Sequence, residues 1–132
     1  MGDINLKIAY ENLFGYSVSK EFSDEILTKL RDDSKVNFDT CVEISDVGLF
    51  FEMLDQEMQK SAKFLGVDAC DYAGKVIMHD AKIPANFPWL KNKSYFYQKE
   101  IRGLWQPLPG VDVNPKIINV PRAKEVCRII HP

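Results

Sequence analysis

The 132-residue sequence is 45% hydrophobic and 27% charged, and its formal net charge at neutral pH is −2. This length fits one domain, residues 1–132, and the apolar content excludes an intrinsically disordered chain. No run of about 18 apolar residues occurs and the N-terminal segment lacks the pattern of a secretory signal, so we expect neither a membrane span nor export.

The beginning of the chain predicts a strand and a helix. Residues 4–8 alternate between apolar and polar side chains, which is typical of a short strand. Residues 10–18 fit no single pattern, and Gly15 is expected to interrupt any element there. Ser23 is a suitable helix N-cap, and acidic residues follow it, as is typical of the first turn of a helix. The helix that starts here should end near Ser34.

The middle of the chain predicts the clearest strand and the longest helix. Residues 36–44 alternate over their whole length. A helix follows, with its N-cap at Ser45 or Asp46 and its end near Leu65, where Gly66 suits a helix terminus. Apolar residues that share one helical face support this length: Val47, Phe50, Phe51, Leu54, Met58, Ala62 and Leu65.

The second half predicts strands separated by proline-rich loops. One further helical turn is expected at 68–73, and the expected strands are 75–79, 94–104 and 116–120. Two long loops should cover residues 80–92 and 105–115. Pro121 suits the first turn of a short final helix, with Val126, Ile129 and Ile130 on its apolar side.

This order of elements predicts an α+β fold. The helices come early and the strands late, and too few helices separate the later strands for a strictly alternating parallel sheet. We therefore expect a largely antiparallel sheet of four or five strands, with two or three helices packed on one face.

The charge is divided unevenly along the chain. Residues 1–66 carry 7 basic and 13 acidic side chains, whereas residues 67–132 carry 10 and 6. Carboxylates gathered on one surface speed the encounter with a positively charged partner. Six carboxylates are therefore interpreted as a partner-binding surface: Asp32, Asp33, Asp39, Glu43, Glu52 and Asp55. The alternative is a solvated face that keeps the protein soluble.

Two tryptophans in the predicted loops are candidate contacts for the same partner. Trp89 lies in the first loop and Trp105 in the second, each close to prolines. Long loops often carry function, and tryptophan is enriched in interface hot spots. The alternative is that both rings cover the edge of the core.

The sequence offers little for metal binding or catalysis. Asp39 and Glu43 would lie about 13 Å apart along one strand, too far to share a proton or an ion. No phosphate-binding glycine loop and no Cys-x-x-Cys pair occur. The three separate cysteines, Cys41, Cys70 and Cys127, suit a reducing compartment. We expect a cytoplasmic protein with no catalytic residues, metal or cofactor.

One enzymatic alternative stays open. His79 and Asp80 could line a ligand pocket between the two loops together with Cys70 and Trp105. Nucleic-acid binding is less favoured. Basic residues do interleave with aromatics over 91–102, but no RNA-binding signature accompanies them and the isoelectric point is about 5.7.

These observations favour a non-catalytic protein-binding module. In its length, expected α+β class, acidic patch and lack of a catalytic motif, the chain resembles bacterial toxin-immunity proteins in general style. That resemblance implies an inhibitor that masks a basic partner such as a toxin nuclease. The alternatives are a small enzyme or ligand-binding domain, and a subunit of a larger complex.

Overall fold

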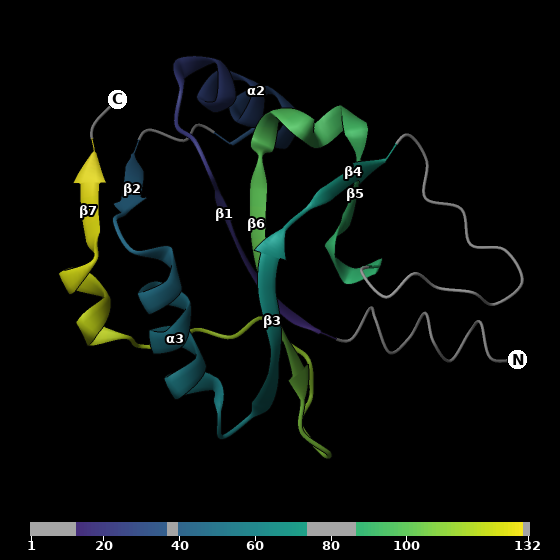
Figure 1. Cartoon of the computed structure of the whole chain (residues 1–132), viewed down its shortest axis with the longest axis vertical. Helices are drawn as coiled ribbons and strands as arrows, with labels where there is room; N and C mark the ends of the chain where they lie inside the picture. Colours follow the sequence, from purple (N-terminus) through teal and green to yellow (C-terminus); the bar gives the residue numbers. More distant parts are fainter. Residues whose placement is uncertain (1–12, 37–39, 74–86, 131–132) are drawn as a thin grey trace, which may run out of the picture.

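The computed structural model describes residues 13–36, 40–73 and 87–130 and confirms the α+β class (Figure 1). Its α-helices are α2 (Asp24–Ser34) and α3 (Val47–Met58), and its 3-10 helices are η1 (Phe87–Trp89), η2 (Lys93–Gln98) and η3 (Pro121–Glu125). Its strands are β1 (Phe14–Ser19), β2 (Cys41–Ile44), β3 (Ala62–Ala69), β4 (Asp71–Ala73), β5 (Leu90–Asn92), β6 (Glu100–Pro107) and β7 (Cys127–Ile130).

The strands are divided among three sheets. β6 lies between β1 and β3 in an antiparallel sheet of three strands. β2 and β7 form an antiparallel pair, which we call the ribbon, and β4 pairs with β5 in parallel. In Figure 1 the ribbon stands at the left, apart from the central three-stranded sheet.

The core lies between α3 and the three-stranded sheet. Phe51 of α3 and Trp105 of β6 are almost fully buried, with their ring centroids 6.3 Å apart. Gly103 of β6 permits this approach, because a Cβ atom there would stand only 2.4 Å from Phe51 Cε1. Asp46 is the N-cap of α3, and its carboxylate accepts a hydrogen bond from the Leu49 amide at 3.0 Å.

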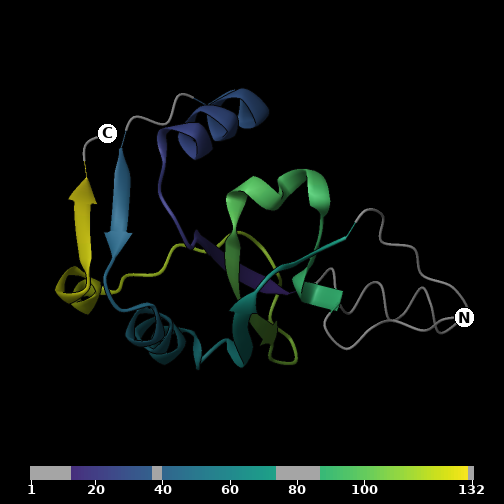
Figure 2. The ribbon, with the colours of Figure 1, turned by 45° about the horizontal axis from the view of Figure 1, so that its top comes forward.

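The predicted helix after Ser23 is confirmed. The Ser23 hydroxyl accepts a hydrogen bond from the Ile26 amide at 3.2 Å, and α2 ends at Ser34 before Lys35, which has a left-handed backbone. Figure 2 shows α2 at the opposite end of the ribbon from α3. The two helices therefore expose their polar faces in different places.

The helix predicted up to Leu65 ends at Met58 instead. Residues 62–69 form β3, which pairs with β6 along its length. The apolar residues of this segment fit both a helical and an alternating pattern, and pairing with β6 decides between them. Gly66 ends no helix: it lies at an irregularity of β3 with φ of 142°, and the Trp89 ring lies 3.8 Å from the position a Cβ would take.

Other predictions for the second half are also corrected. The segment 68–73 is the end of β3 followed by β4, and the segment 94–104 starts as η2 and becomes a strand only at Glu100. Residues 105–107 continue β6, residues 116–120 have no regular structure, and the final helix is only η3, followed by β7. Pairing with distant strands overrides the local patterns at β4, β6 and β7.

Some predicted elements cannot be compared in full. The strands expected at 4–8 and 75–79 lie outside the described residues, as do residues 37–39 of the strand expected at 36–44. The ambiguous segment 10–18 contains the start of β1, and Gly15 does not interrupt that strand. None of the helices in the described part of the chain is both long and apolar enough to cross a membrane.

Candidate functional site

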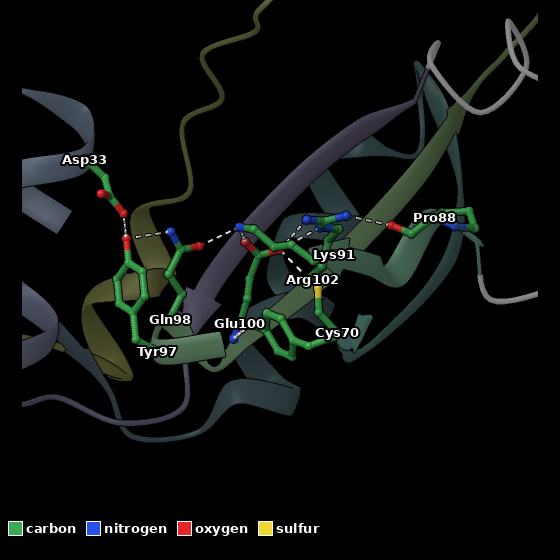
Figure 3. Close-up of polar contacts among 9 residues, drawn as sticks. Asp33, Cys70, Pro88, Lys91, Tyr97, Gln98, Glu100 and Arg102 are labelled. Atoms are coloured by element: carbon green, nitrogen blue, oxygen red, sulfur yellow. Dashed lines mark hydrogen bonds and ion pairs between the residues drawn. The ribbon is translucent and has the colours of Figure 1, made fainter. Parts of the chain in front are cut away.

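A buried ionic cluster lies at the start of β6. Glu100 is only 8% exposed, and its carboxylate accepts hydrogen bonds from three side chains (Figure 3). Lys91 Nζ lies 2.7 Å from Oε1, and both Nε and Nη2 of Arg102 lie 2.7 Å from Oε2. Cys70 Sγ lies 3.2 Å from Oε2. We call these four residues the Glu100 network.

Neighbouring strands bring the four side chains together. Glu100 and Arg102 are two residues apart on β6, so their side chains point to the same face of the strand. Lys91 comes from β5, while Cys70 directly precedes β4, and its amide donates to the Glu100 carbonyl at 2.9 Å. The Tyr72 hydroxyl of β4 accepts from the Glu100 amide at 2.8 Å. The parallel pairing of β4 with β5 therefore completes the network.

The segment around η1 is held against β6 through Arg102. Arg102 Nη1 donates to the Pro88 carbonyl at 2.7 Å, and Trp89 Nε1 donates to the Arg102 carbonyl at 2.8 Å. These contacts use both the side chain and the backbone of one residue, so they fix the position of η1 relative to the sheet.

The hydrogen bonds continue from the Glu100 network to helix α2. Lys91 Nζ also donates to Gln98 Oε1, and Gln98 Nε2 donates to the Tyr97 hydroxyl at 3.3 Å. The Tyr97 hydroxyl in turn donates to the Asp33 carboxylate. Figure 3 shows this unbroken series from the buried end of β6 to the end of α2.

The Glu100 network holds its groups in fixed protonation states. Burial alone would raise the pKa of Glu100, but hydrogen bonds from Lys91, Cys70 and Arg102 outweigh it and lower the pKa from 4.5 to about 2. Burial, aided by the hydrogen bond to Glu100, raises the pKa of Cys70 from 9.0 to about 12. At neutral pH the carboxylate is ionised and the thiol is neutral, so neither is poised for proton exchange or nucleophilic attack.

This lowered pKa predicts a specific sensitivity to acid. The unfolded carboxyl takes up a proton near pH 4.5, whereas the folded one does so near pH 2. Glu100 therefore contributes about 3 kcal/mol to the free energy of unfolding above pH 4.5, and this contribution is lost as pH falls through 2. Urea denaturation at pH 7, 4 and 2.5 should show the decline, and Glu100→Gln should show a shallower one. Equal declines would contradict the assignment.

Helix η2 presents an exposed aromatic turn, which we define as Tyr95, Phe96 and Tyr97. Phe96 is 60% exposed and Tyr95 is 40% exposed. The ring of Tyr72 meets Phe96 edge-on, with 5.4 Å between the centroids. Lys91 Nζ lies 5.1 Å from the centre of the Tyr95 ring. The aromatic turn thus rests on the Glu100 network and on β4.

The aromatic turn is fixed at both ends. Asn92 Oδ1 accepts from the Ser94 amide at 2.9 Å at its start. At its end Lys99 has a φ of 43°, and its amide donates to the Phe96 carbonyl at 3.1 Å. The Lys99 carbonyl accepts a hydrogen bond from the Lys20 amide at 2.9 Å. This bond joins the aromatic turn to the segment after β1.

Helix α2 lies beside the aromatic turn and is rich in exposed acids. Besides the contact between Tyr97 and Asp33, Lys29 Nζ of α2 lies 5.4 Å from the centre of the Tyr97 ring. The exposed carboxylates of this helix are Asp24, Glu25, Asp32 and Asp33. One member of the predicted partner-binding set, Asp33, thus contacts the aromatic turn, and Asp32 precedes it on the same helix.

The other described carboxylates of the predicted set lie on β2 and α3. Glu43 of the ribbon pairs with Arg128 at 2.8 Å. Glu52 and Asp55 lie on α3, and Asp55 accepts a hydrogen bond from Trp105 Nε1 at 3.1 Å. Figures 1 and 2 show α2, α3 and the ribbon as separate elements, so the described carboxylates of the predicted set come from three parts of the fold. Asp39 lies outside the described residues.

Trp105 is a core residue, so its prediction as a contact for a partner is wrong. It is 2% exposed, because β6 continues through it and places its ring 5.1 Å from that of Phe64. Trp89 is half-buried, with its ring nitrogen bonded to the backbone of β6. Of the residues proposed for an enzymatic pocket, Cys70 belongs to the Glu100 network, and His79 and Asp80 lie outside the described residues.

Sequence reasoning missed the Glu100 network. The pair Glu100 and Arg102, two apart on a strand with opposite charges, was the available signal. No sequence signal pointed to Lys91 or Cys70, because their positions beside Glu100 depend on the parallel pairing of β4 with β5.

Comparison with known proteins finds no family, no curated protein and no solved structure that matches this chain. Among the residues that the structure describes, no group of three or more histidine, cysteine, aspartate or glutamate side chains is placed to hold a metal ion. The proposal for function therefore depends on the surface and on the network beneath it.

Proposed function

We propose that this protein is a non-catalytic binding module that masks another protein, in the manner of an inhibitor or immunity protein. The observation that carries this proposal is the aromatic turn: an exposed Phe96 on a segment fixed at both ends, beside the acidic helix α2. In this proposal Phe96 and Tyr95 make the central contact, and the partner carries a basic surface.

The rigidity of the aromatic turn supports a role in binding. Exposed aromatic side chains lose little conformational entropy when a partner covers them, and a preformed contact surface lowers the cost of association further. The Glu100 network supplies that rigidity through Lys91 and Gln98. A buried carboxylate with saturated hydrogen bonds is suited to positioning rather than to chemistry.

The charge of α2 supports a basic partner. Asp33 of this helix contacts the turn, and the exposed acids of α2 would raise the rate of encounter with a cationic surface. A toxin nuclease is one such partner, because its groove for nucleic acid is positively charged. A cytoplasmic location would suit a protein that protects its own cell.

The test begins with the identification of a partner. The tagged protein is recovered from its native host, the retained proteins are identified by mass spectrometry, and binding is measured with the purified candidate. We expect Phe96→Ala to raise the dissociation constant about thirtyfold, as for a hot-spot side chain worth about 2 kcal/mol. Ile117→Ala is the matched control, because Ile117 is fully exposed in a different segment and should have no effect.

A second measurement tests the acidic helix. The triple change Asp24→Asn, Glu25→Gln and Asp32→Asn should slow association about tenfold and weaken its salt dependence. The control triple, Glu52→Gln, Glu57→Gln and Asp112→Asn, removes the same charge outside α2 and should slow it much less. Binding that ignores both Phe96→Ala and the α2 triple would refute the proposed surface.

A further inference from the structure

Helix α2 is the less embedded of the two α-helices. Ile26 is its one buried side chain, whereas α3 buries five. No residue of α2 is among the described residues that form the core around Phe51 and Trp105 or pack against it. In Figures 1 and 2 the helix lies at the top of the molecule. The core around α3 therefore does little to hold α2 in place.

The sequence of α2 would not keep it helical on its own. The helix has 11 residues, and isolated helices shorter than about 12–15 residues are marginal in water. Asp32 and Asp33 stand in its last turn, where the helix dipole disfavours negative charge. α2 therefore depends on its contacts with the rest of the protein, and it should lose its helical structure when those contacts break.

The described contacts of α2 come mainly from η2 and the residue after it. Lys29 and Asp33 are four residues apart and so share one face of the helix. Tyr97 meets both of them: its hydroxyl donates to Asp33, and its ring centre lies 5.4 Å from Lys29 Nζ (Figure 3). Just before the helix Glu21 pairs with Lys99 at 2.8 Å, but that pair is largely exposed and contributes little. Tyr97 is therefore the principal attachment of the helix itself.

The aromatic turn, on the other side of this attachment, is held independently of α2. Asn92 caps its start, and the Lys99 amide closes its end. Lys91 of the Glu100 network reaches Gln98. None of these three bonds involves α2, so the turn can keep its shape when the helix moves away.

We infer that α2 is a detachable arm, which opens as a unit while the rest of the fold stays intact, and that Tyr97 is the residue that holds it closed. Helices with few buried contacts open at a lower free energy than the core does. In the open form Asp33 leaves the aromatic turn. The consequence for binding rests on the proposed function: the partner binds the closed form, so its binding shifts the population toward that form.

Hydrogen exchange, followed residue by residue, tests the opening in the free protein. The hydrogen-bonded amides of α2 should exchange on the order of a hundredfold faster than those of α3, and they should share one opening equilibrium. Exchange no faster than in α3 overturns the proposal. So does a gradient of rates from the helix ends inward without a common value, because it would mean fraying instead of opening as a unit.

Two pairs of variants test the role of Tyr97. Tyr97→Phe removes the hydroxyl and keeps the ring beside Lys29, and it should speed exchange in α2 about tenfold, as expected for the loss of a hydrogen bond to a charged group. Tyr95→Phe, the matched control, should change nothing. Asp33→Asn and Asp32→Asn both remove a charge from the end of the helix. Only the first weakens the contact with Tyr97, so exchange in α2 should be faster in Asp33→Asn than in Asp32→Asn.

The amides of α3 show in the same samples whether each variant is folded. Equal acceleration of α2 and α3 by Tyr97→Phe would make Tyr97 a support of the whole fold, and no acceleration would mean that it does not hold the arm. Either result overturns the assignment of Tyr97. An identified partner at saturation should slow exchange in α2. A bound partner that leaves this exchange unchanged would refute the acidic helix as part of the binding surface, whereas faster exchange of α2 in the free protein would still support the arm.

Discussion

Replacing Glu100 by alanine is expected to lower the free energy of unfolding at pH 7 by about 3 kcal/mol. The substitution leaves Lys91 and Arg102 as neighbouring cations without the carboxylate that both contact at 2.7 Å. It also removes the acceptor of the Cys70 thiol. Urea denaturation measures the loss, and hydrogen exchange should show faster exchange at the Lys99 amide, which closes the aromatic turn.

Glu43→Ala is the matched control for this change. Glu43 also pairs with an arginine, at 2.8 Å, but both side chains are exposed on the ribbon. Exposed ion pairs contribute about 0–1 kcal/mol, so the control should cost little. Similar losses for Glu100→Ala and Glu43→Ala would contradict the view that burial gives the Glu100 network its weight.

Gly103→Ala is expected to destabilise the protein by about 3 kcal/mol or more, through overpacking. The new Cβ would lie 2.4 Å from Cε1 and 2.7 Å from Cδ1 of Phe51, and this ring is 1% exposed with little room to move. Thermal or urea denaturation measures the change. A smaller residue at the other side of the contact, Phe51→Leu, should recover part of the loss in the double variant.

Gly15→Ala provides the comparison on the neighbouring strand. A Cβ at Gly15 would lie 3.4 Å from Cδ2 of Leu104, which is an ordinary contact. This substitution should therefore change the stability by less than about 1 kcal/mol. Equal effects at Gly15 and Gly103 would show that the cost comes from the strand backbone and not from Phe51.

The sequence predicted those elements whose signals are local. Ser23 and Asp46 cap the helices that follow them, and both caps bond as expected. The end of α3 could not be predicted, because the apolar spacing from Ala62 onward suits helix and strand alike. Pairing with β6, which lies far along the chain, decides that β3 is a strand. Trp105 was expected in a loop, but the pairing of β6 with β1 and β3 extends the strand through this residue.

The candidate site was predicted less well than the fold. Asp32 and Asp33 could be recognised as exposed acids, but Phe96 was assigned to the strand expected at 94–104, and the 3-10 helix η2 occupies the start of that segment. Lys91 meets Glu100 only because β4 and β5 run in parallel, and nothing local to either residue predicts that pairing. The uneven charge indicated which half of the chain is acidic, whereas the positions of α2 and α3 in the fold decide where those acids lie.

The paired strands are far apart in the sequence, and this separation affects the rate of folding. Ser45 and Val126, which close the ribbon at 2.8 Å, are separated by 81 positions, and β1 likewise pairs with β6 across most of the chain. Chains dominated by such distant contacts fold slowly, in milliseconds to seconds. During synthesis the backbone groups of β2 that bond to β7 stay without that partner until β7 has emerged from the ribosome, late in the chain.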